Sequence, residues 1–124
     1  MHINHFTDLR VYQASRTLSR QLFKLSAEWP AEERFALVGQ IRRASRSVGA
    51  NLAEAWGKRR YEAHFVSKLT DADGENHETE HWLINAHDCA YLSQDQFKQL
   101  VVEKQEIGRM LGTMILNPGP FLLR

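Results

Sequence analysis

One stretch of this sequence matches a pattern that performs catalysis in other proteins, and it reads His77-Glu78-Thr79-Glu80-His81. It fits H-E-x-x-H, in which two histidines one helical turn apart bind zinc and the glutamate activates a water molecule. A longer form of the pattern adds a third zinc ligand, and His87 falls at that spacing. A zinc hydrolase is therefore the first hypothesis that the sequence raises.

The surrounding sequence argues against that hypothesis. The longer pattern needs a glycine that turns the chain toward the third ligand, and this chain has Ile84 there. On a helix whose buried face includes Thr79, His77 and His81 each project about 160° away from that face. A di-iron bundle would need a second Glu-x-x-His motif, which the chain lacks. We expect no enzyme activity and no cofactor, and His77 and His81 stay candidates for adventitious metal binding only.

Basic residues are the second group that could do chemistry. Residues 31–60 contain seven Lys or Arg against three Asp or Glu, whereas residues 61–90 contain one against seven. Cationic clusters bind nucleic acid by neutralising phosphates and releasing counterions. The sequence therefore predicts a nucleic-acid contact made by Arg42, Arg43, Arg46, Lys58, Arg59 and Arg60. The alternative is that these cations pair with the acidic segment, within one subunit or between subunits.

The elements that must position these residues are helices. Apolar residues recur at alternating spacings of four and three, and no segment alternates with a period of two. Pro30 and Pro118 bound a stretch of the chain that contains no other proline. The predicted helices span about residues 8–27, 31–56, 61–90 and 94–116.

Each predicted helix has one stripe of residues that would face a core. In the third helix this core stripe consists of Phe65, Leu69, Ala72, Asn76, Thr79, Leu83, Ala86 and Ala90. Asn51 is a polar residue in the stripe of the second helix, and Lys104 interrupts that of the fourth. Large aromatics outside the stripes are expected at contacts between subunits, namely Phe23, Phe35, Trp56 and Trp82.

Short turns make successive helices antiparallel neighbours. We therefore predict an all-α fold, an up-down-up-down antiparallel four-helix bundle that forms a single domain over residues 1–124. The chain is 43% hydrophobic and 25% charged, which excludes a disordered protein. It has no apolar run long enough to span a membrane, its first residues do not form a signal peptide, and Cys89 is its one cysteine. We expect a cytoplasmic protein without membrane partners.

Several blocks of the sequence resemble one known family. The most specific block begins Gln40-Ile41-Arg42-Arg43-Ala44 and continues through Ser47-Val48 and Asn51-Leu52-Ala53-Glu54 to Gly57-Lys58. Weaker blocks are Phe6-x-x-Leu9-x-Val11-Tyr12-Gln13-Ala14 and Ala72-x-Gly74. In these blocks the chain resembles the 23S ribosomal RNA intervening-sequence proteins, also described as four helix bundle proteins. Ala55 and Glu75 replace a usual glycine and a usual serine of that family.

The resemblance implies an antiparallel bundle that assembles into a homopentamer and binds RNA or DNA. A related branch, the accessory variability determinants, assists reverse transcriptases, so the resemblance also implies a reverse transcriptase or another protein as partner. Our leading hypothesis is a homo-oligomeric, RNA-binding accessory bundle. Two alternatives stay open, a protein–protein scaffold without nucleic-acid binding and a metal-binding bundle that uses His77 and His81.

Overall fold

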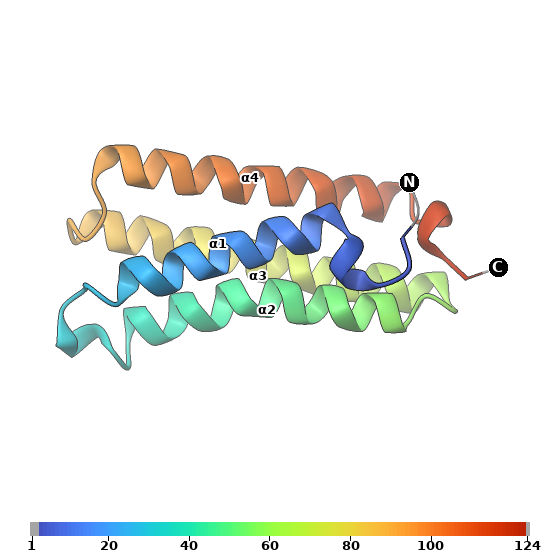
Figure 1. The fold of residues 1–124 in the computed structure, drawn as a ribbon, viewed down its shortest axis with the longest axis horizontal. Coiled ribbons are helices and arrows are strands. Elements are labelled where there is room, and N and C mark those ends of the chain that lie inside the picture. Colours follow the sequence, from blue (N-terminus) through green and yellow to red (C-terminus); the bar gives the residue numbers. More distant parts are fainter. Residues whose placement is uncertain (1–2, 124) are drawn as a thin grey trace.

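The computed structural model describes residues 3–123 and confirms the predicted all-α fold. Four long helices run up, down, up and down along one axis, as Figure 1 shows. They are α1 (Arg10–Ser26), α2 (Leu37–Gly57), α3 (Glu62–Asp88) and α4 (Gln94–Leu116). Three short 3-10 turns accompany them, η1 (Phe6–Asp8), η2 (Ala31–Glu33) and η3 (Gly119–Phe121).

Each helix packs against the next one in the chain, and α4 closes the bundle against α1. The hairpin of α1 and α2 therefore forms one side of the molecule, and the hairpin of α3 and α4 forms the opposite side (Figure 1). None of the helices between residues 3 and 123 has the length and apolar character that crossing a membrane requires.

The core stripes lie where the heptad-like spacing predicts. In α3 the first seven stripe residues are all buried, from Phe65 to Ala86. The eighth, Ala90, is exposed because the helix has already ended, and its φ of 63° reverses the chain direction. In α2 the prediction for Asn51 is wrong, since Leu52 takes the buried position and Asn51 is only half-buried.

The predicted start of the second helix at residue 31 is also wrong. Residues 31–33 form η2, and α2 begins six residues later than expected, after Ala36 leaves helical geometry with φ −117° and ψ −105°. The longer connection folds back over the end of the bundle, where Glu33 accepts a 2.8 Å hydrogen bond from the Tyr91 hydroxyl. Trp29 stacks on the same tyrosine ring, with ring centres 5.6 Å apart. These contacts fasten the α1–α2 connection to the α3–α4 turn.

Lys104 does not interrupt the core stripe of α4 but belongs to it. Its ammonium donates a 2.8 Å hydrogen bond to Glu80 Oε1, and its side chain is only 8% exposed. Its backbone carbonyl accepts a 3.1 Å hydrogen bond from the side-chain amide of Asn76, which is fully buried. A Cβ atom at Gly108 would lie 3.4 Å from that amide nitrogen, so glycine leaves room for it. Polar contacts therefore fix the register of α3 against α4.

Breaking the Glu80–Lys104 pair from either side should have unequal effects. Glu80→Ala leaves a buried ammonium without its carboxylate, and we expect it to lower the free energy of unfolding by about 2 kcal/mol. Lys104→Met removes the charge and keeps the volume, so its stability should equal or exceed that of the wild type. Urea unfolding monitored by circular dichroism measures both. Equal losses in the two variants would show that the pair itself, and not the stranded charge, determines stability.

Candidate nucleic-acid interface

The two hairpins of the bundle have opposite charge. Helices α1 and α2 contain seven Arg or Lys residues and one carboxylate, Glu54, a formal balance of +6. Helices α3 and α4 contain four Arg or Lys residues and ten carboxylates, a balance of −6. Because the hairpins form opposite sides of the molecule, a protein of near-zero net charge presents one basic side and one acidic side.

Three adjoining pockets run along the contact between α1 and α2. The first, of about 260 Å³, shares Arg46 with the second, of about 190 Å³, and the second shares Phe23 with the third, of about 360 Å³. Their lining contains no carboxylate. It contains six cationic side chains, Arg16, Arg20, Lys24, Arg34, Arg42 and Arg46. We call these pockets, with the six cations, the basic groove.

Small side chains let the two helices approach each other under this groove. A Cβ atom at Gly49 would lie 3.4 Å from the Tyr12 ring and 3.5 Å from Ser15 Oγ. Along α1 the lining of the groove extends from Tyr12 to Ser26, and at about 1.5 Å per helical residue this length is about 21 Å. One strand of a duplex presents about six phosphates over that length, at roughly 3.4 Å each.

Arg16, Arg20 and Lys24 were not among the predicted site residues. They follow one another at intervals of four on α1, whose 17 residues include no Asp or Glu. All three are exposed, opposite the buried stripe that contains Leu18 and Leu22. A count of charges over this helix alone would have found them, whereas the charge imbalance identified from the sequence concerned only residues 31–90.

Arg42 connects α2 to the end of α1. Its Nε donates a 2.9 Å hydrogen bond to Ser26 Oγ, and Nη2 donates a 3.0 Å hydrogen bond to the carbonyl oxygen of Phe23. The guanidinium carbon also lies 4.2 Å from the centre of the Phe23 ring. Arg46 lies over the same ring at 5.3 Å and has no carboxylate partner within residues 3–123. Both arginines line the groove with their charge uncompensated.

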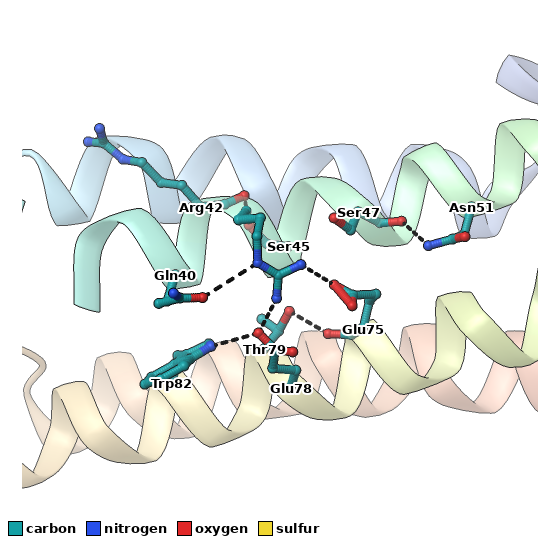
Figure 2. A network of polar contacts seen from close by, with 10 residues as sticks. Gln40, Arg42, Ser45, Ser47, Asn51, Glu75, Glu78, Thr79 and Trp82 are labelled. Carbon is teal, nitrogen blue, oxygen red and sulfur yellow. Dashed lines mark hydrogen bonds and ion pairs between the residues drawn. The ribbon is translucent and has the colours of Figure 1, made fainter. Parts of the chain in front are cut away.

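Arg43 points to the other side of α2 and pairs with α3. It donates a 2.9 Å hydrogen bond to Glu75 and a second one to Glu78, which raises its pKa. Glu78 also accepts a 3.0 Å hydrogen bond from the Trp82 indole, and this bond together with Arg43 lowers the pKa of Glu78. Figure 2 shows the two glutamates and Trp82 reaching from α3 toward α2, while Arg42 points away from them. The charge of Arg43 is therefore paired with carboxylates of the same subunit.

The second predicted cluster lies at the turn between α2 and α3. Lys58 and Arg60 are exposed there. Arg59 is held in place, because its Nε donates a 2.7 Å hydrogen bond to the carbonyl oxygen of Trp56 and its guanidinium lies 3.5 Å from the centre of the indole. Burial lowers the pKa of Arg59. The structure thus separates this cluster from the basic groove, and Lys58 interacts electrostatically with Glu54.

The H-E-x-x-H residues do not converge on a common point. His77 is exposed and its Nδ1 lies 2.9 Å from the carbonyl oxygen of Asp73, while His81 is exposed and contacts Asn85 and the Trp82 ring. Glu78 is occupied by Arg43 and Trp82. Over residues 3–123 no three His, Cys, Asp or Glu side chains are grouped so that they could hold a metal ion.

Comparisons with known proteins agree with this architecture. The family model of the 23S rRNA-intervening sequence protein matches residues 7–113. A protein from Bacteroides thetaiotaomicron with a crystal structure, described as a protein of unknown function from the S23 ribosomal protein family, has a sequence 29% identical to this chain. It superimposes with a TM-score of 0.78 over 86% of this chain and 96% of that one. No curated protein matches the chain.

Trp82→Phe should destabilise the protein in a pH-dependent way. The variant loses the hydrogen bond that contributes most to the lowered pKa of Glu78. A lowered carboxyl pKa adds stability above the pKa of the unfolded chain, and that stability is lost as pH falls through the folded-state value. The difference in free energy of unfolding between wild type and variant should therefore be largest at pH 7 and decrease as the pH falls below about 4.5.

Trp56→Phe is the matched control for this experiment, because within residues 3–123 the Trp56 indole donates to no carboxylate. Urea titrations at a series of pH values measure both variants. A difference for Trp82→Phe that stays constant down to pH 3 would contradict the assigned role of its hydrogen bond.

Proposed function

Because this chain belongs to the 23S rRNA-intervening sequence protein family, we propose that it is a nucleic-acid-binding bundle and not an enzyme. The basic groove between α1 and α2 would hold the phosphate backbone of the nucleic acid. The family description refers to 23S ribosomal RNA, which makes RNA the first ligand to test. The Bacteroides relative has no known function, so this proposal depends on the geometry of the groove.

The observation that supports the proposal is six cations in one groove without a carboxylate among the residues that line it. Elsewhere on the bundle, Arg43, Lys68, Lys104 and Arg109 all pair with carboxylates of the same chain. Surface charges without partners repel one another, and a polyanion that neutralises them releases its counterions. Arg42 and Arg46, which were predicted from the sequence, belong to this groove, whereas Arg43 does not.

Self-association is a second part of the proposal. On α3 and α4, Ile84, Val102 and Leu116 are 43%, 58% and 87% exposed in the isolated subunit. Burying apolar side chains of this size against a neighbouring subunit is more favourable than leaving them exposed to water. We propose a homo-oligomer, and five subunits is the number that the family resemblance implies.

A protein–protein scaffold is the second candidate function, favoured by the acidic hairpin. The ten carboxylates of α3 and α4 could face the basic groove of a neighbouring subunit. In that arrangement the groove would be occupied by protein and could not bind nucleic acid. The two candidates differ in what the groove cations do, and the same set of variants separates them.

Removing three groove cations should weaken RNA binding and its dependence on salt. The triple variant carries Arg16→Ser, Arg20→Ser and Lys24→Ser. These three positions of α1 are exposed, and their side chains have no ion pair within residues 3–123. Each lost phosphate contact on a single strand lowers the slope of log K against log salt by about 0.7, so the triple variant should lose about 2. Fluorescence anisotropy with a labelled 12-nucleotide RNA at KCl concentrations between about 50 and 200 mM measures this slope.

The control variant removes the same charge from the acidic side, with Lys68→Ser, Lys98→Ser and Arg109→Ser. It should keep the salt dependence of the wild type. Identical slopes for the wild type and the groove variant would refute binding in the groove. Light scattering of both variants tests the scaffold, because a groove variant that dissociates into monomers would indicate that its cations hold the oligomer together.

A further inference from the structure

Phe23 is a large aromatic side chain in the basic groove that does not belong to the core. Its side chain is 45% exposed, whereas its neighbour Leu22 on the same helix is fully buried. The ring lines both the pocket that contains Arg20 and Lys24 and the pocket that contains Arg34. It therefore lies where two parts of the groove meet, surrounded by cations on both sides.

Hydrogen bonds hold a guanidinium group over this ring. Arg42 Nε is bonded to Ser26 Oγ at 2.9 Å and Nη2 to the carbonyl oxygen of Phe23 at 3.0 Å. These bonds fix the guanidinium carbon 4.2 Å from the ring centre, and the Arg46 guanidinium carbon is 5.3 Å away. The result is a partly exposed aromatic ring against which hydrogen bonds hold one cationic group before any ligand binds.

We propose that Phe23, braced by Arg42, is a stacking platform for an unpaired base, so that the groove prefers single-stranded nucleic acid to duplex. This inference rests on the proposed function, since it assumes that the groove binds phosphates. Aromatic rings and arginine guanidinium planes are the surfaces on which proteins stack the bases of single strands. In a duplex the faces of the bases are covered by their neighbours, and only the phosphates remain for the groove to bind.

The third pocket of the groove has the composition that such a base requires. Trp29, Pro30 and Val38 supply apolar walls beside Phe23, and Arg34 and Arg42 supply positive charge. Its volume of about 360 Å³ falls within the range of clefts that hold small ligands, roughly 300–1,000 Å³. Apolar walls suit the flat ring of a base, and the cations suit the phosphates on either side of it.

Three 12-nucleotide probes separate stacking from phosphate binding. They are an unstructured single strand, the same strand annealed to its complement, and an abasic strand with the same phosphates but no bases. Each is prepared as RNA and as DNA, because stacking alone does not distinguish the two sugars. The protein variants are Phe23→Leu, which keeps apolar volume without a ring, and Phe23→Tyr, which keeps the ring.

The wild type should bind the single strand about tenfold more tightly than the abasic strand, which corresponds to one stacked base. Phe23→Leu should remove that tenfold difference, and Phe23→Tyr should preserve it. Affinity for the abasic strand should be the same in all three proteins, which also shows that the variants fold. Anisotropy titrations at one fixed salt concentration measure these affinities.

Equal affinity of the wild type for the abasic and base-bearing strands, with strong salt dependence, would overturn the stacking platform and leave the proposed function intact. The same would follow if Phe23→Leu kept the full preference for the base-bearing strand. Failure of the wild type to bind any of the three probes would overturn the proposed function itself, and the stacking platform with it.

Discussion

Burial of one stripe of side chains on each helix determines what the rest of this molecule can present to water. Leu22, Ile41, Leu69 and Leu111 are fully buried, one from each helix, and they fix the rotation of that helix about its axis. Once the rotation is fixed, every other side chain has its direction, because residues on a helix are about 100° apart. The basic groove is thus largely a consequence of core packing, which sets the direction of its cations on α1 and α2, and hydrogen bonds to Ser26 and Phe23 then hold Arg42 in place.

Neighbouring arginines of α2 illustrate how strong this effect is. Arg42 reaches the end of α1 and the ring of Phe23, while Arg43, the next residue, reaches the carboxylates of α3. In the sequence they form one basic cluster. In the structure Arg42 lines the groove, whereas Arg43 forms an ion pair on the other side of the helix. Charge that is clustered along the chain is therefore not charge that is clustered in space.

The periodicity of the sequence was enough to predict the fold and most of the core. It could not predict that Lys104 would be buried, because the partner that makes burial tolerable, Glu80, lies 24 residues away on another helix. Nor could it place the start of α2, since the connection before it is held by Tyr91, which lies 58 residues further along the chain in the α3–α4 turn. For the candidate site, the cations of α2 were recognised from their clustering. Those of α1 were missed because the charge imbalance that revealed the cluster was identified in residues 31–90, which exclude the first helix.

Opposite charges on the two hairpins give the molecule a permanent electric dipole across its long axis. Such a dipole turns a protein as it diffuses toward a charged surface, before the two make contact. Near a polyanion the hairpin of α1 and α2 would face forward, and collisions in the wrong orientation would be fewer. The arrangement of charge in this bundle therefore affects the speed and orientation of encounter, even though the net charge of the chain is only +1.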